Sequence, residues 1–319
     1  MSTMRAAVFH GDERVELRPV QRPEPSPGEV CVQLEGCGVC ASNLPVWSGR
    51  PWFRYPLGPG APGHEGWGEV VSTGESVTDI AVGERVALLS GRAYAEYDLA
   101  DASSVVRIPA SLASRPVPGE PLACAMNIFR RSDIQPGQRV AIVGVGFIGA
   151  VLIQLAVRAG AQVVAIVRRS YAGEVARRCG ASEAIATADV HSAIGAAREV
   201  AAGGYPRVIE AAGEQATLDI ASALVAEGGR LIIAGYHQDG PRQVDMQQWN
   251  WRGIDVVNAH ERDPAVAVRG LREAMVALDE RRIDLSGLIT HRYPIGALAK
   301  AFAALRTRPD GFLKAVVEP

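Results

Sequence analysis

The residues of this chain with the clearest chemical potential are metal-binding side chains in three short segments. Cys40 lies in GVCASN, His64 and Glu65 lie in PGHEG, and Glu120 lies in GEPLAC. Thiolate, imidazole and carboxylate groups together suit zinc, and a catalytic zinc keeps one position open for water or substrate. Each residue alone has a structural alternative, since a single cysteine usually packs as a small apolar side chain. Together the segments predict one metal site.

A second motif, GVGFIG, predicts a dinucleotide-binding loop. It contains Gly144, Gly146 and Gly149, with Phe147 and Ile148 before the last glycine, and it follows the apolar run RVAIV. The first glycine permits a tight turn, the second lets the backbone approach a pyrophosphate, and the third allows helix and strand to pack closely. The N-terminus of the following helix then presents unpaired N–H groups to the phosphates. The alternative is a glycine-rich turn that binds no ligand.

The residues after the next apolar run indicate which dinucleotide binds. An NAD site usually has Asp or Glu about 20 residues beyond the glycine loop, where it holds the ribose 2′-hydroxyl. This chain has Arg168 and Arg169 there, directly after Val167. Guanidinium groups attract a 2′-phosphate and no carboxylate at this position repels it, so NADP(H) is favoured over NAD(H). The alternative is a solvated basic turn.

Two kinds of elements must position these motifs. In the first third of the chain, β-rich runs bounded by Gly and Pro predict a turn at 24–28 and strands over 5–9, 29–35, 68–73 and 85–89. From about residue 121, strands over 139–143, 162–167, 207–210 and 230–234 alternate with helices over 147–159, 174–179 and 216–226. This alternation predicts a parallel sheet with helices on both faces. A strand after residue 285, a helix around 296–305 and a strand over 312–317 complete the expectation.

Length and composition predict a globular protein of two domains. The chain has 319 residues, 48% of them apolar, and a formal net charge of −2. This charge gives no reason to expect nucleic acid or an anionic membrane as partner, and no apolar run is long enough to span a membrane. The first ten residues lack the plan of a signal peptide, so a cytoplasmic location is expected. The five cysteines argue against a disulfide framework, and Cys37 is interpreted as a packing residue.

Taken in order, these segments resemble the zinc alcohol dehydrogenase branch of the medium-chain dehydrogenase/reductase superfamily. The resemblance covers almost the whole chain, and the order and spacing of its pieces make it specific. The pieces are PSPGEV from Pro25, GVCASN around Cys40, PGHEGWG around His64, VGERV from Val82, EPLACA from Glu120, the glycine loop, and RPDGFLK ending at Lys314.

The resemblance implies an α/β fold class with two domains. A GroES-like β-rich catalytic domain is expected from 1–121 and 287–319. A doubly wound parallel-sheet Rossmann domain is expected over 122–286, inserted between the two parts of the first. In this family the active site lies in the cleft between the domains.

The resemblance also implies the zinc ligands. Cys40 and His64 are the expected ligands, Glu120 is the expected third ligand, Glu65 is the other candidate, and Cys124 is the least favoured. Neighbouring residues on an extended chain point to opposite faces, so His64 and Glu65 bind one ion only if the backbone turns between them. The choice between the two carboxylates stays open.

Ser42 and Lys314 have implied roles as well. Ser42, two residues after Cys40, is the expected first proton acceptor in catalysis, with Glu65 also counted among the catalytic residues. Lys314 is expected to reach the pyrophosphate of the cofactor.

Three departures from the family pattern have consequences. The lobe of four cysteines that holds a structural zinc is absent, so one catalytic zinc per chain is expected. Asn43 stands where the family usually has Asp, and a neutral amide would orient a ligand histidine but raise its basicity less. Pro45 stands near the position of the family's relay histidine, so the proton must leave by another route.

These observations predict a zinc-dependent oxidoreductase that transfers hydride between NADP(H) and a secondary alcohol or ketone, with a polyol or sugar-like substrate favoured. A homodimer is expected from family habit. The alternatives are a zinc-free reductase of the quinone or enoyl type, a non-catalytic NADP(H)-binding protein, and a metal-sequestering protein.

Four aromatic residues between two ligand segments either line the substrate pocket or pack on the core: Trp47, Trp52, Phe53 and Tyr55. Trp249 and Trp251 are expected at the cleft or at a subunit contact.

Overall fold

The structure, a computed structural model, describes residues 2–113, 115–238 and 240–319. The chain divides into two compact units. The first comprises Met1–Ala123, Asp263–Asp279 and Ile289–Pro319, and the second comprises Cys124–Arg262 and Glu280–Leu288. The sequence-based boundaries assign 263–279 to the inserted domain, whereas the contacts of this segment group it with the first unit.

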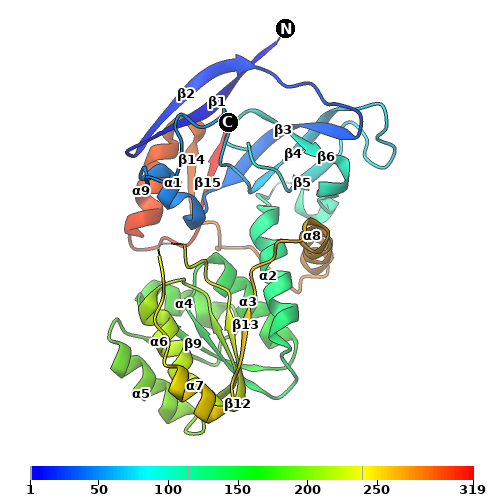
Figure 1. Cartoon of the computed structure of the whole chain (residues 1–319). Coiled ribbons are helices and arrows are strands. Elements are labelled where there is room, and N and C mark those ends of the chain that lie inside the picture. Colours follow the sequence, from blue (N-terminus) through cyan, green and yellow to red (C-terminus); the bar gives the residue numbers. More distant parts are fainter. Residues whose placement is uncertain (1, 114, 239) are drawn as a thin grey trace. The chain divides into compact units, whose positions relative to one another are not determined.

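The first unit is built on a seven-stranded sheet (Figure 1). Its order is β14-β15-β3-β4-β5-β7, and β6 also pairs with β3. The strands are β3 (Glu29–Gly38), β4 (Gly66–Thr73), β5 (Arg85–Leu88), β6 (Tyr97–Asp101), β7 (Val105–Arg107), β14 (His291–Pro294) and β15 (Ala315–Glu318). The strands predicted near 29–35, 68–73 and 85–89 are therefore confirmed. A separate antiparallel pair, β1 (Thr3–Gly11) and β2 (Arg14–Gln21), contains the strand predicted over 5–9.

Aromatic side chains from distant segments form the core of the first unit. The ring of Phe302, on α9 (Leu298–Thr307), has its centroid 5.6 Å from Phe9, 5.6 Å from Trp47 and 6.0 Å from Tyr94. Trp47 ends the short helix α1 (Leu44–Trp47), and its Nε1 donates to the backbone oxygen of Glu13 at 3.0 Å. Burial of large aromatic rings is the main stabilising contribution expected here.

Most of the four aromatic residues between the two ligand segments contribute to this core. Trp47 belongs to the core, and Phe53 and Tyr55 pack against it. Trp52 is 60% exposed. Of the two alternatives, lining the substrate pocket or packing on the core, packing on the core fits three of these four residues.

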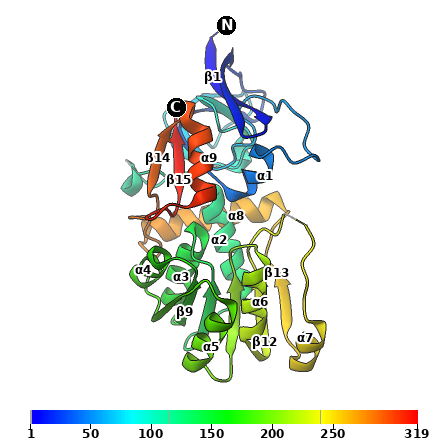
Figure 2. The ribbon, with the colours of Figure 1, turned by 90° about the vertical axis from the view of Figure 1, so that its left-hand side faces the viewer.

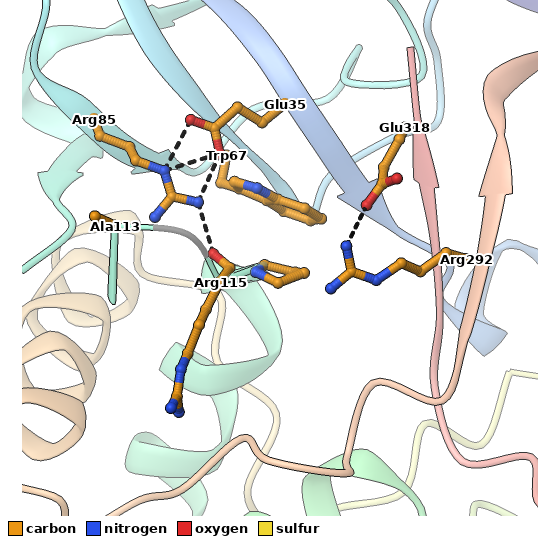
Figure 3. A pocket seen from close by; sticks show the side chains of 8 residues that line it. Glu35, Trp67, Arg85, Ala113, Arg115, Arg292 and Glu318 are labelled. Carbon is orange, nitrogen blue, oxygen red and sulfur yellow. Dashed lines mark hydrogen bonds and ion pairs between the residues drawn. The ribbon is translucent and has the colours of Figure 1, made fainter. Parts of the chain in front are cut away.

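A pocket of about 190 Å³ opens on the same sheet over the buried ring of Trp67 (Figure 3). Arg85 donates to the carboxylate of Glu35 and to the backbone oxygens of Leu112 and Arg115. On the other side of the pocket, Arg292 pairs with Glu318 at 3.0 Å. The first pair links β5 to β3 across β4, and the second links the neighbouring strands β14 and β15. The charged residues around this pocket therefore have a structural role in the sheet.

The second unit contains a six-stranded parallel sheet in the order β10-β9-β8-β11-β12-β13. The strands are β8 (Arg139–Val143), β9 (Gln162–Val167), β10 (Glu183–Ala186), β11 (Tyr205–Glu210), β12 (Val225–Ile233) and β13 (Asp255–Asn258). The predicted strands 139–143 and 162–167 are confirmed to the residue. The strand order reverses between β8 and β11, which is where open sheets of this kind bind ligands at the carboxyl ends of their strands.

Helices cover both faces of this sheet, as the alternating pattern predicted (Figure 2). α3 (Phe147–Arg158) and α4 (Ser170–Arg178) pack on β8, β9 and β10, while α5 (Val190–Val200) and α6 (Gln215–Leu224) pack together against the strands from the other side. Trp249 of α7 (Met246–Arg252) packs on the core of this unit, whereas Trp251 is 85% exposed.

Two further helices, α2 and α8, lie outside the two sheets. α2 (Gly119–Ser132) contains the point at which the two units divide, and α8 (Pro264–Asp279) groups with the first unit. Among the helices of the described residues, none has the length and apolar character needed to cross a membrane.

Candidate functional site

Three strand ends bring the metal-binding segments together. β3 runs antiparallel to both β4 and β15, so the end of β3 lies beside the starts of its two neighbours. Cys40 follows β3, Glu65 precedes β4 and Lys314 precedes β15. Cys37 is paired with Gly66 on one side and with Val317 on the other. The sheet therefore gathers residues that are far apart in the sequence.

The side chains of Cys40, His64 and Glu65 form a potential metal site. One donor atom from each lies within 4.8 Å of the others. His64 Nδ1 is 2.9 Å from the backbone oxygen of Pro62. A carbonyl can only accept, so Nδ1 carries a proton and Nε2 is the nitrogen that a metal would bind in exchange for a proton. The donor set and the orientation of the imidazole both fit zinc.

Ser42 and Asn43 support this site from the 3₁₀ turn η1 (Ala41–Asn43). The hydroxyl of Ser42 donates to Cys40 Sγ at 3.1 Å. Asn43 was expected to orient the ligand histidine, but its Nδ2 instead donates to the Pro62 oxygen at 3.2 Å. The backbone carbonyl thus orients His64, and Asn43 acts one contact further away.

Glu65 forms an ion pair that the sequence did not predict. Lys314 Nζ lies 2.5 Å from Glu65 Oε2 and 2.7 Å from Oε1, and it also donates to the Val39 oxygen at 3.2 Å. Glu65 is 0% exposed and Lys314 is 6% exposed. Gly38 makes room for the carboxylate, because a Cβ there would lie 1.7 Å from Glu65 Oε2. Lys314 is therefore held beside the metal donors, and its expected contact with the cofactor pyrophosphate stays a prediction.

Opposing effects of burial and charge set the protonation of the two basic groups. Burial by itself lowers the pKa of His64, but the hydrogen bond and charge of Cys40, with the carboxylates of Glu120 and Glu65, raise it to about 10. Burial also disfavours the charged form of Lys314, and the negative charges of Glu65, Cys40 and Glu120 outweigh that effect, so its pKa is raised. Negative groups therefore surround both basic side chains and favour their charged forms.

Glu120, the expected third ligand, lies near the site without joining the donor group. It is half-buried at the start of α2, and its charge raises the pKa of both His64 and Lys314. Cys124 is likewise outside the group of donors found among the described residues. Cys37 is 1% exposed within the core of the first unit, which confirms its interpretation as a packing residue. The role of Glu120 as ligand stays a prediction.

The glycine loop has the geometry that a dinucleotide site needs. Gly144 follows β8 with a φ of +97°, and Gly149 cannot carry a side chain because a Cβ would lie 2.4 Å from the Gly144 oxygen. A Cβ at Gly146 would meet nothing within 4 Å, so the backbone there is open to an approaching group. Phe147 and Ile148 begin α3, so a phosphate at this loop would meet the positive end of the helix dipole.

The two arginines after β9 differ in their surroundings. Arg168 is exposed and pairs with Glu214 at 3.6 Å, while Arg169 is half-buried and precedes α4. Glu214 lies directly before α6. Sequence reasoning singled out the arginines but not their carboxylate neighbour, because that neighbour comes from a loop 46 positions further along.

A buried polar network near the end of β11 was also missed. Glu210 is 0% exposed, and its Oε1 accepts from the backbone N–H groups of Ala212 and Gly213 at 2.8 Å. Its Oε2 lies 2.9 Å from His237 Nε2, and Arg242 Nε donates to His237 Nδ1 at 3.0 Å. His237 is thus the Nε2–H tautomer. The network ties the turn after β11 to the loop after β12.

Comparison with known proteins places this geometry in a family. Residues 26–110 match the alcohol dehydrogenase GroES-like domain, and residues 148–273 match the zinc-binding dehydrogenase domain. An alcohol dehydrogenase of Geobacillus stearothermophilus is 30% identical over 266 residues, which cover 73% of this chain and 77% of that protein. The chain belongs to the zinc-type alcohol dehydrogenases of the medium-chain dehydrogenase/reductase superfamily.

Other members of this alcohol dehydrogenase family align over most of their length. Sorbitol dehydrogenase of Gallus gallus is 28% identical over 349 residues, covering 96% of this chain and 93% of that protein. A zinc-binding dehydrogenase from Sinorhizobium meliloti 1021, solved with NADP, superimposes with a TM-score of 0.85 at 27% identity, with 100% of both chains covered. The fold class and the family expected from the sequence are confirmed. As a family member the chain is an NAD(P)-dependent oxidoreductase of the alcohol dehydrogenase type, with a small molecule as substrate.

Proposed function

We propose that this alcohol dehydrogenase is zinc-dependent and transfers hydride between NADP(H) and a secondary alcohol or ketone, with a polyol or sugar-like substrate. The observation that carries the proposal is the grouping of Cys40, His64 and Glu65 donors within 4.8 Å. Sorbitol dehydrogenase among the relatives and a carboxylate in the donor set support the polyol substrate.

The residues around the site have separate tasks in this proposal. When bound, zinc supplies Lewis-acid activation of a substrate oxygen and the nicotinamide accepts or supplies hydride. Cys40 and His64 would hold the ion, and the Pro62 carbonyl, which accepts from Nδ1, leaves Nε2 as the metal-binding nitrogen of His64. The hydroxyl of Ser42, next to the Cys40 sulfur, would relay a proton: it would accept one from the substrate hydroxyl as it passes its own to water, and the reverse transfer would protonate the carbonyl oxygen.

Either Glu65 or Glu120 would be the third ligand. Glu65 is in the donor group, but its charge is neutralised by Lys314 and it would have to loosen that ion pair to bind zinc. Glu120 lies outside the donor group, so its carboxylate would have to move toward the other donors to bind zinc. Comparing zinc affinity of Glu65→Gln and Glu120→Gln decides between them, because only loss of a true ligand removes a metal bond.

The NADP(H) preference rests on Arg168 and Arg169 at the carboxyl end of β9. The loop that binds the cofactor pyrophosphate would consist of Gly144, Gly146 and Gly149, together with the N–H groups of Phe147 and Ile148. A homodimer and a cytoplasmic location remain predictions in this proposal.

Metal analysis and cofactor titration test the proposal together. Purified enzyme should contain about one zinc per chain, and Cys40→Ala should lose most of it, whereas Cys179→Ala should keep it because Cys179 lies in the second unit. Arg168→Ala should weaken NADPH binding about tenfold with little effect on NADH. Zinc-free wild-type enzyme, or full zinc in Cys40→Ala, would overturn the metal site; equal losses for both cofactors would overturn the NADP(H) preference.

A further inference from the structure

The ion pair between Arg168 and Glu214 spans the dinucleotide loop of the second unit. Arg168 follows β9 and Glu214 follows β11, and β8 lies between these strands in the sheet. The glycine loop begins at the carboxyl end of β8. A contact from the end of β9 to the turn after β11 must therefore pass beside that loop.

The glycine loop touches both flanking segments. On the β9 side, the N–H of Gly144 donates to the Ile166 oxygen at 2.9 Å. On the β11 side, a Cβ at Gly144 would lie 2.9 Å from the Ala212 side chain, two residues before Glu214. The buried Glu210 fixes the Ala212–Gly213 backbone. The position of Glu214 relative to the glycine loop is therefore set by packed backbone.

The ion pair between Arg168 and Glu214 is weak enough for Arg168 to change partners. Arg168 NH1 and Glu214 Oε2 are 3.6 Å apart, and the side chains are 61% and 51% exposed. An exposed ion pair of this length contributes little free energy, so a dianionic phosphate that makes two-pronged contacts with the same guanidinium can replace the carboxylate.

We propose that Glu214 is a specificity-determining residue that competes with the 2′-phosphate of NADP(H) for Arg168. The inference rests on the proposed NADP(H)-binding function. Binding of NADPH breaks the Arg168–Glu214 pair and transfers the guanidinium to the phosphate, whereas NADH binds with the pair intact. Glu214 thus reduces the gain in NADPH affinity that Arg168 provides. The difference in affinity between NADPH and NADH becomes smaller, so NADH can still bind although no acidic residue follows β9.

The test is calorimetric or fluorescence titration of the purified enzyme with NADPH and NADH, so that affinity is measured without turnover. Glu214→Gln should lower the Kd for NADPH about two- to fivefold, the range expected for release of an exposed ion pair, and leave the Kd for NADH within a factor of about 1.5. The same change in the Arg168→Ala background should have no effect on NADPH. Glu227→Gln is the control, because it removes an exposed carboxylate near the start of β12, at the opposite end of the strands.

Three results would overturn the inference. They are an unchanged NADPH Kd in Glu214→Gln, an equal gain for NADH, and a gain that persists in the Arg168→Ala background. The last would mean that Glu214 repels the phosphate directly. If Arg168→Ala alone weakens NADPH selectively while Glu214→Gln changes nothing, the competition fails and the NADP(H) preference stands. If Arg168→Ala affects both cofactors equally, the preference itself fails.

Discussion

At the scale of single residues, the buried pair of Glu65 and Lys314 is the most consequential feature. Two charges removed from water cost free energy that only close mutual contact offsets. Here both carboxylate oxygens lie within 2.7 Å of the ammonium. The pair holds Glu65 beside Cys40 and His64, so it fixes a candidate ligand in place while neutralising its charge. Neither residue type nor spacing reveals such a pair, because 249 positions separate its members.

Replacing Lys314 by Met should therefore destabilise the first unit strongly. The variant leaves the Glu65 carboxylate buried without its partner, a loss of about 3–5 kcal/mol at neutral pH. The negative charges around Lys314 raise its pKa, so the stabilisation is fully present below the lysine pKa of the unfolded chain and is lost only as the pH rises through the higher folded value. Denaturant unfolding at pH 7 therefore measures the full loss.

Two further variants give this prediction its controls. Lys300 is the only other lysine of the chain and is exposed on α9, so Lys300→Met should change stability by less than about 0.5 kcal/mol. The double variant Lys314→Met with Glu65→Gln should recover part of the loss, because it removes the unpaired carboxylate. A double variant no more stable than Lys314→Met would contradict the assignment to an unpaired carboxylate.

At the scale of elements, the sequence predicts best where one physical signal dominates. β8 and β9 are continuous apolar runs buried on both faces, and the predicted bounds match those of the structure. β2 alternates between exposed and half-buried residues, so hydrophobic patterning gave no clear signal for it. The segment of α8 was expected in the other domain, because chain order does not reveal which unit a helix contacts. The meeting of Cys40 with His64 and Glu65 followed from the family resemblance. It depends on β3 pairing with β4, a long-range register that local pattern does not encode.

The network around Glu210 should set the stability of the carboxyl edge of the second sheet. Glu210→Ala leaves two backbone N–H groups and His237 without their acceptor, which we expect to cost about 2–4 kcal/mol. Glu227→Ala, an exposed carboxylate on β12, should cost less than about 0.5 kcal/mol. Chemical denaturation with hydrogen exchange of the Ala212 and Gly213 amides measures both. Equal, small losses in the two variants would show that the network contributes no stability.

At the scale of the whole molecule, the unpaired edge of the second sheet bears on the expected homodimer. β13 ends the sheet, and among the described residues it pairs only with β12. An open edge strand with apolar side chains is a site for pairing with another chain. Val256 on this strand is 38% exposed, and the neighbouring α7 carries the exposed Trp251. These features support β13 as the contact of the predicted homodimer.

Replacing Val256 by Lys should therefore shift the enzyme from dimer to monomer. A charge on the edge strand opposes pairing with a second strand, because it would be buried there without a partner. Val276 on α8 is 50% exposed and provides a matched control, since Val276→Lys adds the same charge to the first unit, whereas β13 belongs to the second. Light scattering with size-exclusion chromatography should give the dimer mass for wild type and Val276→Lys and a lower mass for Val256→Lys. A wild-type monomer would contradict the predicted homodimer. If Val256→Lys forms a dimer as tightly as wild type, β13 is not the contact, because a strand that tolerates the added charge is not buried between subunits.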